Sequence, residues 1–234
     1  HADLCQHAAH PFLNLYEGNQ VGTVCFDFYW GSSSHNTLFR NAVDMRSQRV
    51  DGRPMTRNLV AMRLDAHSRF VNALGNVLGR EGMKGRVETL GSSDFSTPSI
   101  WSLGHPGDPR VAGTLLRHGN YDYVSRKTQW DPKISDHELP DSLYLARKPG
   151  FFKNLPWPPI GPDRQPMVGT IPARERFLAI PVAEREAQDL LYLAEFQRAA
   201  GRGDEARAAF RDVLAKYPAS SSAAAARAGL DGLK

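Results

Sequence analysis

Side chains capable of proton transfer are concentrated in two short stretches of the first third of the chain. Asp27, His35 and Arg40 fall in one stretch, and Asp65 and His67 fall in the next. Carboxylates and imidazoles act as general acids and bases when they face a reacting group. No Asp-Asp or Asp-x-Asp pair accompanies them. We therefore favour a structural interpretation, in which these residues lie on a solvated face or satisfy turns, over a catalytic one.

A second group, near the first residue, is rich in metal-binding side chains. His1, Cys5, His7 and His10 follow one another closely, but their spacing matches no standard zinc pattern. The amine and ring of His1 could chelate copper if His1 is a true N-terminus. The favoured interpretation is a polar terminal segment without a metal.

Composition divides the chain into three zones. Hydrophobic residues make up 41% and charged residues 23% of the 234 residues, which excludes a disordered chain and a membrane-embedded one. Residues 1–126 are rich in Gly, Asn and Ser, residues 127–183 carry most of the prolines, and residues 184–234 are rich in Ala, Glu and Arg. We expect strands in the first zone, an irregular tail in the second and helices in the third.

The formal net charge is +4, a mild excess of basic residues. These residues are scattered among acidic ones and form no block beside aromatic residues. A solvated basic surface is therefore favoured over a nucleic-acid site. The same bias suits an anionic polysaccharide.

A recurring phrase, in which apolar residues lead into asparagine, organises the first zone. Asn19, Asn41, Asn76 and Asn120 are separated by 22, 35 and 44 residues. One rung of about 22 residues, two such rungs, and one rung enlarged by the polar stretch 46–57 would explain these intervals. Asn tolerates the left-handed backbone of a tight corner, and stacked Asn side chains can hydrogen-bond between rungs. The pattern predicts short parallel strands over residues 10–126, with almost no helix before residue 184. An antiparallel sandwich remains the alternative.

Several segments resemble late rungs and the terminal tail of bacterial pectate-lyase-like proteins. The resemblance spans about residues 10–165 and rests on these segments: Glu17–Asn19, Trp30–Asn41, Gly75–Gly79, Arg117–Tyr123, Trp130–Pro132, Leu139–Leu145, Lys148–Phe152 and Trp157–Asp163. It implies a mainly β fold, a right-handed parallel β-helix (solenoid), with an irregular Pro-rich tail packed along it and a small C-terminal α-helical hairpin. The domains would be residues 1–126, 127–183 and 184–234.

The last zone resembles a single tetratricopeptide repeat. Leu190, Leu193 and Ala194, then Ala206 and Phe210, then Pro218 fit its 34-residue frame. Gly201–Asp204 would form the turn, with Asp204 capping the second helix. A third helix is expected over about Ser221–Leu233. Leu190 and Gln197 stand where the family has large aromatic residues.

The resemblance implies two functions. The first is a non-catalytic extracellular or cell-surface scaffold or adhesin (periplasm is the alternative location) that assembles with other subunits or binds polysaccharide. The second is a polysaccharide-active enzyme, a lyase or glycoside hydrolase, lacking part of its catalytic rungs. No cofactor is expected, although a lyase would use calcium. Tyr29, Trp101, Tyr121 and Tyr123 are candidates for stacking on sugar rings, whereas Trp30 and Trp130 are expected in the core.

Such proteins carry further rungs before the point where this chain begins. We therefore expect other protein subunits, or more of the chain, to contact the uncapped first rung and the C-terminal helices. Cys5 and Cys25 are 20 residues apart, close to one rung, which permits a disulfide between adjacent strands. The alternative is two separate cysteines, with Cys25 in a strand and Cys5 in an irregular leader.

Overall fold

The computed structural model describes residues 3–7, 9–46 and 55–233. They divide into two compact units, residues 1–172 and 173–234. The first unit holds the strands, whose bounds are β1 Leu4–Gln6, β2 Leu15–Glu17, β3 Gln20–Val21, β4 Val24–Phe26, β5 Ser33–Ser34, β6 Thr37–Phe39, β7 Ala42–Val43, β8 Val60–Leu64, β9 Ser68–Arg69, β10 Asn72–Leu74, β11 Val77–Leu78, β12 Arg86–Leu90, β13 Ser99–Leu103, β14 Leu116–His118, β15 Asn120–Asp122 and β16 Lys127–Gln129. The helices are α1 Arg110–Thr114, a 3-10 turn at Gly150–Phe152, α2 Pro172–Ala179, α3 Val182–Ala199, α4 Gly203–Lys216 and α5 Ser222–Asp231.

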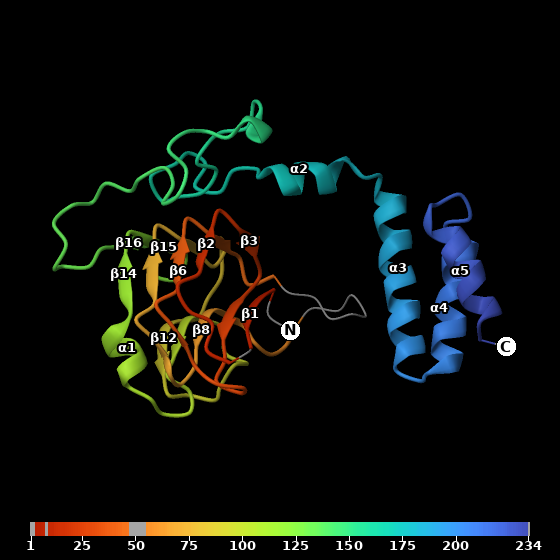
Figure 1. Cartoon of the computed structure of the whole chain (residues 1–234), viewed down its shortest axis with the longest axis horizontal. Helices are drawn as coiled ribbons and strands as arrows, with labels where there is room; N and C mark the ends of the chain where they lie inside the picture. The colour runs from red at the N-terminus through yellow and green to blue at the C-terminus, as the bar shows by residue number, and fades with distance from the viewer. Residues whose placement is uncertain (1–2, 8, 47–54, 234) are drawn as a thin grey trace. The chain divides into compact units, whose positions relative to one another are not determined.

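The strands stack into three main parallel sheets (Figure 1), ordered β1-β4-β8-β13-β12, β14-β10-β6-β2 and β16-β15-β11-β7-β3, with β5-β9 as a smaller fourth sheet. Among the named strands, only the β15–β16 pair is antiparallel. In the second sheet Leu15 pairs with Thr37, Thr37 with Asn72, and Asn72 with Leu116. These steps are the same 22, 35 and 44 residues that separate the repeated asparagines.

A ladder of asparagines runs between the second and third sheets, with Asn19 half-buried and Asn41, Asn76 and Asn120 buried. The side chain of Asn19 donates to Asn41 Oδ1 (2.9 Å), that of Asn41 to Asn76 Oδ1 (3.0 Å), and that of Asn76 to Asn120 Oδ1 (2.8 Å). Each acceptor oxygen also takes the backbone N–H of the asparagine before it in the ladder. The predicted hydrogen bonds between stacked asparagines are therefore confirmed.

The left-handed corner lies one residue before each asparagine. Gly18, Gly75 and Gly119 have φ values of 73°, 62° and 68°, and Arg40 at the equivalent place has φ 49°. The four ladder asparagines are not among the residues with positive φ, so the expectation that they adopt this conformation is wrong. Glycine adopts it without strain, which leaves each asparagine free to use its side chain in the ladder.

The interior of the first unit is apolar. Phe26, Leu38, Leu64, Ile100 and Trp101 lie among its fully buried residues. They come from strands β4, β6, β8 and β13, and all five residues of β13 are buried. Trp30 does not join them, because it is 63% exposed, and the core position expected for it is wrong.

The fold class expected from the sequence is wrong. Helical residues account for 26% and strand residues for 23%, so the chain has a mixed α/β fold with several short parallel sheets and not a mainly β solenoid or β-helix. The strands are only two to five residues long, and helices α1 and α2 contradict the expected near-absence of helix before residue 184. Helix α1 is too short to show a period. Helix α2 begins at Pro172, because proline suits the first position of a helix even though it breaks an interior.

The second unit consists of helices packed through a small apolar core. Ala194 on α3 meets Ala206, Phe210 and Val213 on α4, and Ala226 on α5. Asp204 lies inside the first turn of α4 and makes no side-chain capping bond, so the predicted cap is wrong. Among the described helices, none combines the length and the apolar character needed to cross a lipid bilayer.

Candidate functional site

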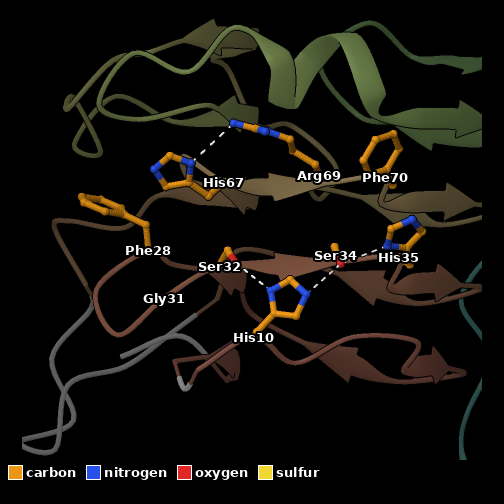
Figure 2. Close-up of a pocket in the computed structure, with 9 residues that line it drawn as sticks. All are labelled: His10, Phe28, Gly31, Ser32, Ser34, His35, His67, Arg69 and Phe70. Atoms are coloured by element: carbon orange, nitrogen blue, oxygen red, sulfur yellow. Dashed lines mark hydrogen bonds between the residues drawn. The ribbon is translucent and has the colours of Figure 1, made fainter.

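A surface pocket of about 700 Å3 lies over the β5–β9 sheet. Figure 2 shows its lining, in which Phe28 and Phe70 lie on opposite sides of His67 and Arg69. Among the residues that the structure describes, the lining combines aromatic, imidazole, hydroxyl and guanidinium groups and includes no carboxylate. The residues are His10, Phe28, Gly31, Ser32, Ser34, His35, His67, Arg69 and Phe70.

Parallel pairing brings these residues together from three segments. Ser34 of β5 pairs with Arg69 of β9, and Phe12 forms a bridge to Ser34 from the other side. His35 and Phe70 follow directly and have φ values of 53° and 55°. Their rings stack 4.9 Å apart with an interplanar angle of 19°. The sheet thus presents a stacked imidazole–phenyl pair, in which Phe70 keeps 51% of its surface exposed.

Serine hydroxyls hold the imidazoles of His10 and His35 in place. His10 Nδ1 lies 2.6 Å from Ser32 Oγ, and His10 Nε2 lies 3.3 Å from Ser34 Oγ. His35 Nδ1 lies 2.9 Å from the same Ser34 oxygen. The dashed lines of Figure 2 follow these contacts. Ordered polar groups beside exposed rings are suited to binding a ligand that has both apolar faces and hydroxyls.

Arg69 supplies the positive charge of the pocket. Its Nη2 donates to Asp108 Oδ2 at 2.7 Å and lies 3.4 Å from His67 Nδ1. Asp108 also accepts hydrogen bonds from the backbone of His67 and from Arg110. The Arg69 hydrogen bond, with these others, holds the pKa of Asp108 well below its usual range despite burial. Asp108 therefore stays ionised and fixes Arg69 in place.

Asp65 and Arg40, two of the catalytic candidates, do not face this pocket. Asp65 is fully buried and accepts two hydrogen bonds from Arg63, at 2.9 and 2.6 Å. Arg40 is also buried, and its guanidinium donates hydrogen bonds to the Pro-rich segment. Figure 1 shows this segment following β16. His35 and His67 are the candidates that line the pocket.

Arg40 uses all five of its N–H donors on that segment. Two go to Asp163, at 2.7 and 2.9 Å. The other three go to the backbone oxygens of Leu139, Pro140 and Ile160. Arg40 is thus a structural anchor that reaches segments about 100 and 120 residues away in sequence.

Asp27 lies beside the metal-binding candidates instead. Its Oδ2 is 2.5 Å from His7 Nδ1 and 3.8 Å from Cys5 Sγ. Cys5 pairs directly with Cys25 across β1 and β4, and both thiols are free. The bridge that the spacing permits is therefore absent, although the predicted strand adjacency is confirmed. Burial raises the pKa of both thiols, and the carboxylate of Asp27 raises that of Cys5 further.

The remaining metal candidates are apart from this group. His10 lies in the pocket, bonded to serines. The expectation for His1 falls outside the described residues. Cys25 and Asp27 were missed as metal-binding groups, although Cys5-Gln6-His7 and Cys25-Phe26-Asp27 share an alternating spacing that puts all four side chains on one face of paired strands.

The aromatic candidates have different environments. Trp101 is buried in the core, and Tyr29 is 70% exposed beside His7. Tyr121 and Tyr123 meet edge to face and pack near Ile160. Phe28 and Phe70, which were not selected from the sequence, provide the exposed rings of the pocket. The sequence gives no signal that distinguishes these two residues, because the exposure of a phenylalanine cannot be predicted from the residues next to it in the chain.

Comparison of the chain with protein-family models, curated proteins and solved structures finds no match. The resemblances to pectate-lyase-like proteins and to a tetratricopeptide repeat therefore stay predictions.

Proposed function

We propose that this protein is a non-catalytic scaffold that binds polysaccharide through the pocket over β5 and β9. The observation that carries the proposal is the stacked pair formed by His35 and Phe70, both exposed in the pocket, with serine hydroxyls and Arg69 beside it. Sugar rings have apolar faces that pack on aromatic rings and hydroxyls that pair with polar side chains. Both kinds of contact are available on one surface here.

The charge of the site favours an acidic polysaccharide. Arg69 is the charged residue of the lining, the lining has no carboxylate, and the whole chain carries +4. A uronate carboxylate can pair with the guanidinium of Arg69, since an arginine presents donors that match a carboxylate. Asp108 shares this charge, so we expect the preference over neutral glycans to be moderate and to weaken with added salt.

The arrangement of the carboxylates supports binding rather than hydrolysis. Glycoside hydrolases of the usual type place two carboxyl groups on either side of the scissile bond. Asp27 and Asp65 are bonded to His7 and Arg63 and do not line the pocket. A uronate lyase is the second candidate function, favoured by one observation: the imidazole of His67 and the guanidinium of Arg69 lie together in the pocket.

Calorimetric titration with oligogalacturonate and with neutral xylo-oligosaccharides tests the proposal. Phe70→Ala should weaken oligogalacturonate binding about tenfold, because a stacked aromatic contact is worth about 1–2 kcal/mol. Tyr144→Ala removes another exposed aromatic residue, outside the pocket lining, and should change nothing. Binding that is absent, or equally strong in Phe70→Ala, would refute the proposed site. Formation of unsaturated uronides during long incubation would instead establish the lyase.

The proposal includes an extracellular or cell-surface location, where long polysaccharides are met, and assembly with other subunits. Tyr192 and Phe196 of α3 keep 64% and 41% of their surface exposed and suit a protein contact. Sedimentation that shows only a monomer at micromolar concentration would count against self-assembly.

A further inference from the structure

Two thiols and a carboxylate meet at one edge of the first sheet, and none of the three residues is part of the pocket lining. Strands β1 and β4 pair in parallel, with Cys5 directly opposite Cys25. Asp27 comes two residues after Cys25, so its side chain points to the same face of the strand. The two sulfur atoms and a carboxylate oxygen of Asp27 all lie within 4.8 Å of one another.

We propose that Cys5, Cys25 and Asp27 bind a borderline-soft divalent metal ion of the zinc class. With metal–sulfur bonds of about 2.3 Å and metal–oxygen bonds of about 2.0 Å, tetrahedral ligand atoms are roughly 3.5–3.8 Å apart. The contact between Cys5 Sγ and Asp27 Oδ2 is already 3.8 Å. The remaining separations, which are at most 4.8 Å, need to shorten by no more than about 1.3 Å, which small side-chain rotations provide.

A hydrogen-bonded chain behind Asp27 suits the carboxylate to this task. The indole of Trp30 donates to His7 Nε2 at 3.1 Å, and an indole N–H can only donate. His7 Nε2 must therefore accept, which places the proton of the neutral imidazole on Nδ1, facing Asp27 Oδ2 at 2.5 Å. Asp27 Oδ1 also accepts the backbone N–H of Tyr29. Such partners orient ligands around protein-bound metals.

The ligand types define the metal. Two thiolates select zinc or similarly soft ions over calcium and magnesium, which require oxygen ligands. Arg63 lies opposite Cys25 on β8. Its guanidinium is engaged by Asp65 and stacks 4.0 Å from the Phe95 ring centre, so it brings positive charge near the site without competing as a ligand. Three protein ligands leave a fourth position for water or another ligand, as in zinc sites that bind exchangeable groups.

The same two sulfurs could instead form a disulfide, so the test must separate the two outcomes. The full chain, reduced and then freed of reductant under argon, is titrated with Co2+ and then with Zn2+. We expect one Co2+ per chain, with the ultraviolet charge-transfer band of thiolate coordination and the visible bands of a tetrahedral ion, and displacement by Zn2+. The proposal would be overturned if the reduced protein showed no saturable Co2+ band. It would also be overturned if the protein bound Co2+ only after Cys5 and Cys25 had been oxidised.

Three variants locate the site. Cys5→Ser changes an exposed residue, so the fold is retained, and it should abolish most of the charge-transfer band. His7→Ala should lower Co2+ affinity about 10–100-fold while keeping both sulfur ligands. Asp212→Asn removes a paired carboxylate from α4 and should leave the affinity unchanged. An unaltered band in Cys5→Ser, or an equal loss in Asp212→Asn, would exclude this site. The carbohydrate proposal does not depend on the result.

Discussion

Replacing Asn76 by alanine should destabilise the first unit strongly, and much more than replacing Asn14 by alanine. Asn76 is fully buried at the centre of the asparagine ladder. Its Oδ1 accepts from the backbone and side chain of Asn41, at 2.9 and 3.0 Å. Its Nδ2 donates to the backbone oxygen of Leu38 at 2.9 Å and to Asn120 at 2.8 Å. Alanine removes all four bonds.

The expected loss follows from that count. One intramolecular hydrogen bond contributes about 0.5–1.5 kcal/mol net, and a buried group left without a partner costs about 1–3 kcal/mol. The Asn41 N–H and the Leu38 carbonyl would lose partners in the interior, where water does not replace them easily. We therefore expect Asn76→Ala to lower the free energy of unfolding by about 3–5 kcal/mol, a large part of the roughly 5–15 kcal/mol of a typical domain.

Urea denaturation followed by tryptophan fluorescence measures this loss. Trp30, Trp101, Trp130 and Trp157 all belong to the first unit, so the signal reports that unit alone. Asn14→Ala is the matched control, because Asn14 is exposed and its side chain donates one hydrogen bond, to Asn36 Oδ1. The control should lose no more than about 1 kcal/mol, since Asn36 Oδ1 keeps the backbone N–H of residue 14 as a donor. Equal losses in the two variants would refute the reasoning.

Three further predictions concern other contacts. Arg40→Met should make the Pro-rich segment sensitive to limited proteolysis, because it removes the donors that bond to Asp163 and to three backbone carbonyls. Cleavage rates like those of the parent protein would contradict the role of Arg40 as an anchor. Burial alone would raise the pKa of Asp163, but the hydrogen bonds and charge of Arg40 hold it below its usual range. The stability advantage of the parent over Asp163→Asn should thus be constant above about pH 5 and fade as pH falls below about 4, in chemical denaturation across pH. Gly229→Ala should destabilise the second unit, because the new Cβ would meet the Phe210 ring at 2.4 Å. This clash should outweigh the stabilisation of about 1 kcal/mol that alanine normally gives a helix over glycine. An increased melting temperature would contradict this prediction.

The local repeat was readable from the sequence because a buried amide must find partners. The intervals between Asn19, Asn41, Asn76 and Asn120 set the pairing of the strands. The conformation of each corner was assigned to the wrong residue, because both Asn and Gly tolerate positive φ and only the structure distinguishes them. Helices α1 and α2 were missed because neither gives a periodic signal.

The candidate sites were predictable only where chemistry and strand spacing coincide. His35 and His67 were selected for their side chains and do line the pocket. Cys5 and Cys25 were placed on adjacent strands because their separation is near one repeat. By contrast, the role of Arg40 depends on carbonyls about 100 residues later in the chain, and no local pattern encodes such a contact. The exposed rings of Phe28 and Phe70 depend likewise on which segments leave them uncovered.

The asparagine ladder has a consequence for engineering the chain. It joins neighbouring strands whether 22, 35 or 44 residues of sequence lie between them. The length of the connecting segment is therefore not fixed by the stack, and doubling a flexible loop costs only about 0.6 kcal/mol in closure entropy. Foreign peptides grafted between two ladder positions should leave the strand register intact, so this unit can serve as a display framework whose inserted loops vary in length while the asparagines keep their partners.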